Sequence, residues 1–202
     1  MKISPATAAD VDEAVDRLAA AFANDGITGF LLNTGPGYRE RVSTFFSLLM
    51  RARIALDMPV LVARNSTGIL GAVMGYATSH PAWPRELSDA WDRFEGSVPG
   101  MTQRLAAYEA VSAGCKPSPP HYYLGVIGTD PEAQGHGIGS QLIRTFSDLS
   151  AADSLSDGVY LETAQESNLR FYQRAGFVET GRGQLGEATL WCLYLRHESR
   201  TL

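Results

Sequence analysis

The sequence predicts an α/β protein with antiparallel strand pairs toward both ends. Three observations support this prediction. Of the 202 residues, 45% are apolar, which is enough for a sizeable buried core. Two segments, 60–78 and 177–196, have the composition of strand pairs joined by turn residues. In the second half of the chain, strand and helix patterns follow one another in the order β-α-β-α-β-β.

The first 80 residues are expected to hold two helices and the first strand pair. Apolar residues over 11–22 recur at helical spacing, and Asp10 can cap that helix. The stretch 24–38 contains several glycines and is expected to be a loop. A second helix is predicted over 42–54, and the strand pair follows it.

Residues 81–119 are the least regular part of the sequence. Apolar positions predict one helix over 83–94 and another over 101–108, with a Pro-Gly break at 99–100. This segment could bury little surface alone, so we expect a helical arm inserted into a single domain over 1–202.

The second half supplies the remaining elements. Residues 122–127 are a buried strand by composition, and an amphipathic helix is predicted over 138–149. A short strand over 159–161 precedes a helix that Ser167 can cap and Gly176 ends.

Composition excludes several classes of protein. Lys and Arg number 17 against 22 Asp and Glu, a net charge of −5, which disfavours nucleic-acid binding. No signal-like apolar region follows the first residues, and no apolar run is long enough to span a bilayer. Two distant cysteines, Cys115 and Cys192, suggest free thiols in the cytoplasm. The four histidines lack metal-ligand spacing, so no metal is expected.

The most informative stretch is the glycine-rich segment 134–140, which lies between a predicted strand and a predicted helix. Alternate glycines let the backbone approach a ligand closely, and the helix start adds a positive dipole end. Together these features predict a cradle for an anion such as a pyrophosphate. The alternative interpretation is that this segment is an ordinary glycine-rich turn that binds no ligand.

A dinucleotide-binding oxidoreductase is a further alternative. Gly135-x-Gly137 begins its fingerprint, and Glu162 ends a strand about 20 residues later. However, Ser140 occupies the third glycine position, and only one short strand and a strand pair follow instead of a parallel sheet.

Two motifs resemble the GNAT family of N-acetyltransferases. The pattern Gln134-x-x-Gly137-x-Gly139 resembles the family's acetyl-CoA pyrophosphate loop, and 168–177 resembles its N-x-x-x-Y-x-x-x-G-F signature. Weaker similarity over most of the chain is to puromycin N-acetyltransferase-like members. The resemblance implies a mixed, mostly antiparallel sheet flanked by helices and splayed between its fourth and fifth strands.

The same resemblance implies direct transfer of an acetyl group from acetyl-CoA to an amine. Main-chain groups of Ile127 and Thr129 would pair with the pantetheine arm, and an N–H near Ile127 would polarise the thioester. Asn168 would reach the pantetheine end, and His136 would touch phosphate. The expected cofactor-binding residues are Ile127, Gly128, Thr129, Gln134, Gly135, His136, Gly137, Ile138, Gly139, Ser140 and Asn168.

Two residues are expected to be catalytic. Tyr172 matches the family's tyrosine and would donate a proton to the departing thiolate. Glu162 is the favoured general base because it ends the strand beside the gap, although a solvated strand-end glutamate is an equal alternative. His121 and His136 are weaker candidates for the base.

The acceptor is the least determined part of the prediction. An acidic chain with aromatic residues near the cleft suits a cationic, partly apolar small amine, of which an aminonucleoside is one example. The aromatic residues expected around it are Phe30, Tyr38, Tyr76, Trp83 and Tyr123. A different class of function is a non-catalytic acetyl-CoA-binding domain that regulates or assembles with partners. Monomer and homodimer remain open.

Overall fold

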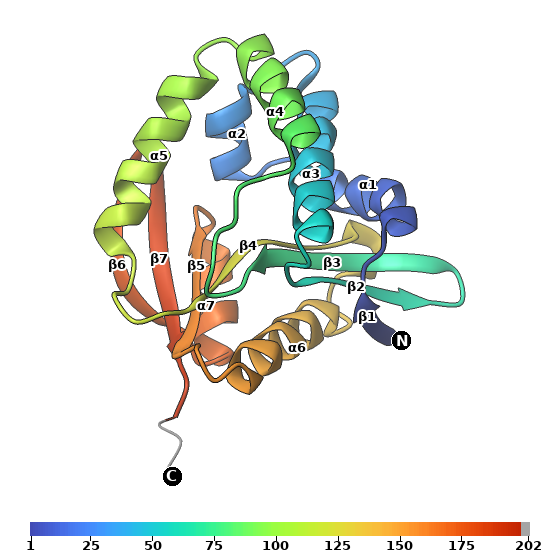
Figure 1. Ribbon diagram of the computed structural model, residues 1–202, viewed down its shortest axis with the longest axis vertical. Helices are drawn as coiled ribbons and strands as arrows, with labels where there is room; N and C mark the ends of the chain where they lie inside the picture. The colour runs from blue at the N-terminus through green and yellow to red at the C-terminus, as the bar shows by residue number, and fades with distance from the viewer. Residues whose placement is uncertain (199–202) are drawn as a thin grey trace.

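The computed structural model describes residues 1–198 and contains one seven-stranded sheet (Figure 1). The strand order is β1-β2-β3-β4-β5-β7-β6, and only the β4–β5 pairing is parallel. The strands are β1 (Lys2–Pro5), β2 (Val60–Asn65), β3 (Gly68–Tyr76), β4 (Tyr122–Thr129), β5 (Gly158–Thr163), β6 (Val178–Leu185) and β7 (Ala188–Arg196).

Seven α-helices cover the two faces of the sheet in the described chain. The helices are α1 (Val11–Ala21), α2 (Gly26–Leu32), α3 (Tyr38–Ala55), α4 (Arg85–Ser97), α5 (Met101–Cys115), α6 (Ile138–Ala152) and α7 (Glu166–Arg174). In Figure 1, α1 to α5 lie on one side of the sheet and α6 lies on the other. Short 3-10 turns precede α1 at Ala8–Asp10 and α6 at Pro131–Ala133.

A small apolar cluster contains Tyr160, Leu185, Leu190 and Cys192. Alternation of side chains along the strands also produces two larger apolar cores. One core joins α1 to α5 with β2 and β3, and Phe46 and Met74 are fully buried in it. The other joins α6 and α7 with the opposite face, around Phe146 and Leu161. Each amphipathic helix therefore buries its apolar stripe against the sheet face it covers.

The sheet opens in its middle, between β4 and β5. The two strands pair only from Tyr122 to Leu124 on β4, while β4 continues to Thr129. A register shift in the β3–β4 pairing falls at this point, where Gly125 is the extra residue of a bulge. The predicted splay between the fourth and fifth strands is confirmed, and with it the mixed α/β fold class.

A predicted loop proved wrong in part. Residues 24–38 were expected to be irregular, but they contain the helix α2. The Asp25 carboxylate accepts a hydrogen bond from the Thr28 N–H at 2.8 Å, which caps the helix. Gly29 is tolerated inside it because Leu31 and Leu32 are buried against the first core.

Three helix boundaries differ from the predictions for local reasons. Asp10 precedes α1 but accepts from the Thr7 N–H at 2.8 Å and does not cap α1. Trp83 lies outside α4 because Pro84 occupies the N-cap position. Ser167 lies inside α7, whose N-cap is Gln165.

The parallel sheet of a dinucleotide-binding fold is absent from residues 1–198. Five of the six pairs of neighbouring strands are antiparallel, and β7 lies between β5 and β6. The fold on which the oxidoreductase alternative depended is therefore not the fold of this chain. Within the described residues, no helix is both long and apolar enough to cross a membrane.

Candidate functional site

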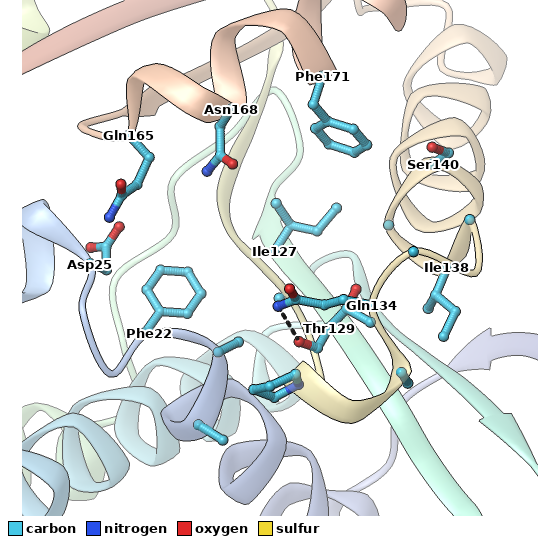
Figure 2. A pocket seen from close by; sticks show the side chains of 18 of the residues that line it. Phe22, Asp25, Ile127, Thr129, Gln134, Ile138, Ser140, Gln165, Asn168 and Phe171 are labelled. Carbon is cyan, nitrogen blue, oxygen red and sulfur yellow. Dashed lines mark hydrogen bonds between the residues drawn. The ribbon is translucent and has the colours of Figure 1, made fainter.

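The larger of two adjoining cavities lies where β4 and β5 separate. Its volume is about 720 Å³, and it is lined by the end of α1, by β4, by the glycine loop and by α7. Figure 2 shows Asn168 and Phe171 directed from α7 toward Ile127 and Thr129 of β4. Phe22 and Asp25 close the side opposite to the glycine loop.

The glycine loop presents main-chain donors to this cavity. Gly135 and Gly137 have φ of 79° and 76°, conformations that other residues adopt at a cost. Among the described residues, the N–H groups of 135–140 have no hydrogen-bond partner. The start of α6 at Ile138 adds the positive end of its dipole. The loop can therefore bind a phosphate group without a lysine or arginine.

The exposed edge of β4 supplies the second half of this cavity. The Asp130 N–H donates to Leu70 at 2.9 Å, so the main-chain groups of Gly128 also face β3. Main-chain groups of successive residues in a strand face opposite sides. The N–H and C=O groups of Ile127 and Thr129 therefore face the gap, where β5 no longer pairs with β4. The Gln134 side chain donates to the Thr129 carbonyl at 3.4 Å (Figure 2). An extended amide-containing ligand could add to this edge like a strand.

The structure brings ten of the eleven expected cofactor-binding residues to the wall of this cavity. These are Ile127, Gly128, Thr129, Gln134, Gly135, Gly137, Ile138, Gly139, Ser140 and Asn168. His136 is the exception. Its Nδ1 lies 3.0 Å from the Gln134 carbonyl and 3.2 Å from the Ala133 carbonyl, so the ring folds back on the loop.

Tyr172 lies where this cavity meets a second one. Its side chain is 5% exposed and packs edge-on against Phe171 and Phe177. Burial raises the pKa of Tyr172, and the charge of Asp25 raises it further. No hydrogen bond is found for its hydroxyl among the described residues. The phenol is therefore neutral at ordinary pH.

The second cavity, of about 300 Å³, lies on the α1–α5 side of the sheet. Residues of α2, α3, α4, α5, β3, β4 and β5 line it. Many of their side chains are aromatic. Five residues line both cavities: Phe22, Asp25, Ile127, Asn168 and Tyr172. The two spaces therefore adjoin at the point where the strands part.

Glu162 lines the second cavity from the end of β5. Its carboxylate accepts one hydrogen bond from the Tyr108 hydroxyl at 3.0 Å and another from the Ser112 hydroxyl. Tyr108 and Tyr123 hydroxyls are 2.9 Å apart, and burial raises the pKa of both phenols well above the usual value. A carboxylate has about four acceptor positions, so Glu162 retains capacity for a ligand amine.

The predicted aromatic group is divided by the structure. Tyr76, Trp83 and Tyr123 line the second cavity, whereas Phe30 and Tyr38 do not. His121 is also outside both cavities. It is buried, and its Nδ1 lies 2.7 Å from the Pro119 carbonyl. No cluster of metal-binding side chains occurs in residues 1–198.

Sequence reasoning missed two charged residues of the site, Asp25 and Arg53. Asp25 follows the end of the first helix, where the sequence indicates only a helix break. Arg53 lies four residues after Leu49 and eight after Phe45, on the apolar stripe of the predicted helix 42–54. The signal in the sequence that could have identified Arg53 was a positively charged residue on an otherwise apolar helix stripe.

Comparisons with known proteins agree with this geometry. Residues 103–179 match the family model of the acetyltransferase (GNAT) domain. The chain is 33% identical over 102 residues to N-alpha-acetyltransferase RimI of Mycobacterium tuberculosis, a match that spans 50% of this chain and 61% of that relative.

Solved structures resemble the chain over nearly its whole length. A histone acetyltransferase HPA2 and related acetyltransferase from Corynebacterium glutamicum has a TM-score of 0.74 at 24% identity, covering 99% of this chain and 98% of that one. A polyamine N-acetyltransferase of Drosophila melanogaster has a TM-score of 0.66 at 16% identity, covering 97% and 99%. The family resemblance predicted from the two motifs is confirmed.

Proposed function

We propose that the protein transfers an acetyl group from acetyl-CoA to a small-molecule amine, because residues 103–179 match the GNAT acetyltransferase model and the chain has the fold of that family. The observation that supports this most strongly is the meeting of two cavities at Tyr172. One cavity has the donors for an anionic, amide-containing donor substrate. The other is smaller and partly apolar.

The larger cavity fits acetyl-CoA by its chemistry. The N–H groups of 135–140 would hold the pyrophosphate, and the β4 edge at Ile127 and Thr129 would pair with the pantetheine amides. Asn168 would contact the pantetheine end near the thioester. When bound, acetyl-CoA supplies an acetyl group activated by a thiolate leaving group.

Main-chain donors near the bulge at Gly125 would stabilise the charge that develops on the thioester oxygen. The amine nitrogen would bond to the acetyl carbon as the carbon–sulfur bond breaks. Tyr172 would donate its phenolic proton to the leaving sulfur, a role for which a raised pKa keeps the proton available. Glu162 would accept the amine proton, either directly or through one water.

The size of the acceptor cavity supports a small amine. Its 300 Å³ are closed by α4 and α5, the arm expected over 81–119. The RimI relative is named an N-alpha-acetyltransferase, and the Drosophila protein acts on polyamines. Neither name fixes the acceptor of this chain.

Two measurements test the proposal. Thermal shift would show stabilisation by acetyl-CoA and none by NAD. Release of free CoA thiol would then be followed with a panel of amino acids, aminonucleosides, polyamines and peptides. Acetyl-CoA binding without acetylation of any amine would favour the non-catalytic alternative. Stabilisation by NAD alone would overturn the proposal.

A further inference from the structure

A buried cation lines the acceptor cavity. Arg53 is 4% exposed and belongs to the last turn of α3. Its Nη1 donates to the Leu49 carbonyl at 3.1 Å, and its guanidinium lies 4.6 Å from the ring centre of Tyr76. The Trp83 indole donates to the Tyr76 hydroxyl at 2.8 Å and holds that ring in place. The guanidinium is therefore fixed in position before any ligand binds.

No carboxylate of the described chain pairs with this cation. The ion pairs within residues 1–198 use Arg17, Arg51, Arg64, Arg85 and Arg182, but not Arg53. Its Nε is buried without a hydrogen-bond partner, and burial lowers the pKa of the group. Because an arginine stays charged in proteins, the positive charge is buried without a counter-ion.

The free end of Arg53 faces β4 within the second cavity. Its Nη2 lies 3.3 Å from the position that a Cβ on Gly125 would take. Gly125 is the bulged residue of β4 at which the strands part. A group bound to Nη2 therefore lies beside the β4 segment where the acetyl transfer is proposed.

We propose that the acceptor is an amino acid, whose carboxylate pairs with Arg53 while its adjacent amine faces the thioester. This inference rests on the proposed function and names the substrate class of the same site. A guanidinium binds a carboxylate through two parallel hydrogen bonds, which fixes orientation as well as position. An α-amine is one carbon away from the carboxylate, which matches the closeness of Arg53 to the transfer site.

The remainder of the cavity favours an apolar or aromatic side chain on that amino acid. Phe45, Phe46 and Trp91 line it, and the first two are buried. Glu162 supplies the opposite charge for the ammonium group before it is deprotonated. A peptide amine lacks the nearby carboxylate and would leave Arg53 unpaired, as would a polyamine.

The test compares matched acceptors. Phenylalanine, tryptophan, leucine and methionine would each be assayed beside the corresponding amide and the decarboxylated amine. We expect at least one amino acid to exceed both of its partners by tenfold or more in kcat/KM. Amines or amides acetylated as well as the acids would overturn the carboxylate proposal while leaving the acetyltransferase proposal intact.

Variants of Arg53 test whether its charge causes the preference for the amino acid over the decarboxylated amine. Arg53→Met should raise KM for the preferred acid at least tenfold more than it raises KM for the decarboxylated amine. Arg53→Lys keeps the charge and should retain part of the preference. Arg51→Met is the matched control, since Arg51 lies on the same helix, is exposed and pairs with Asp12 outside the cavity. An unchanged preference in Arg53→Met would overturn the proposal.

A binding measurement separates this inference from catalysis. Phenylalanine and 3-phenylpropionate, which lacks the amine, should each raise the melting temperature of the wild type and of Arg51→Met, but not of Arg53→Met. If this pattern of stabilisation is seen but no CoA is released, the carboxylate-binding site is supported and acetyl transfer is rejected. Absence of both binding and acetylation for every amino acid tested would overturn the inference.

Discussion

The Tyr108 hydroxyl donates a 3.0 Å hydrogen bond to the carboxylate of Glu162, and this contact joins α5 of the arm to the end of β5. The Ser112 hydroxyl, one turn later on α5, donates to the other carboxylate oxygen. The inserted arm therefore closes the acceptor cavity and also orients the carboxylate proposed as the base.

Replacing Tyr108 by phenylalanine tests that orientation. We expect kcat/KM for the acceptor to fall about tenfold or more, since a hydrogen bond to a charged group contributes roughly 1.5–3 kcal/mol. The affinity for acetyl-CoA should not change, because Tyr108 is absent from the donor cavity. Steady-state kinetics and a binding titration measure the two effects.

Tyr194→Phe is the matched control for this substitution. The Tyr194 hydroxyl is buried without a hydrogen-bond partner and lines neither cavity. Its removal should leave kinetics unchanged and should not lower the melting temperature. Equal losses of activity in both variants would show that Tyr108 acts only through general packing.

Gly137→Ala tests the anion cradle. No atom lies within 4 Å of the added methyl group, so the effect comes from the φ of 76°, which costs roughly 1–2 kcal/mol for other residues. We expect the Kd for acetyl-CoA to rise about tenfold as the loop shifts, measured by calorimetry. Gly114→Ala, in α5 with equally open space, should leave that Kd unchanged.

Asp25→Asn tests the electrostatics of the junction. Burial raises the pKa of Asp25 above 3.8, so its ionisation lowers the stability of the fold as the pH rises through that raised value. Asparagine keeps an acceptor for the Thr28 N–H but carries no charge. The melting temperature of the variant relative to the wild type should therefore be higher at pH 7.5 than at pH 4. A relative loss at pH 7.5 would contradict this.

The proposed role of Tyr172 predicts how turnover depends on pH. Burial raises its pKa above 10, so the phenol stays protonated and able to donate throughout the range below that value. We expect wild-type kcat to show no loss from Tyr172 ionisation between pH 8 and pH 10. An alkaline decline with a midpoint below 10 that disappears in Tyr172→Phe would refute this assignment.

Much of the fold follows from local patterns in the sequence. The strand pairs and the helices over α3, α6 and α7 have clear periodicity, and both motifs lie at the edges of the cavity they predicted. The glycine loop was predictable because its function depends on the backbone. The position of the His136 ring could not be predicted, because the loop's own carbonyls lie within hydrogen-bond distance of its Nδ1.

The acceptor side could not be predicted in the same way. Arg53, Tyr108 and Glu162 come from three distant elements, and only tertiary packing brings them to one cavity. The overall charge of −5 suggested a cationic acceptor, whereas the buried charge of Arg53 favours a carboxylate beside the amine. Local desolvated charges determine recognition more strongly than net charge does.

Tyr172→Phe tests the central claim most directly, because it removes one hydroxyl from the point where the two cavities meet. With saturating acetyl-CoA and the preferred amine, kcat should fall by roughly 100-fold or more, as expected for loss of a general acid. The Kd for acetyl-CoA should stay within twofold. An unchanged kcat in a correctly folded variant would contradict the proposed role of Tyr172.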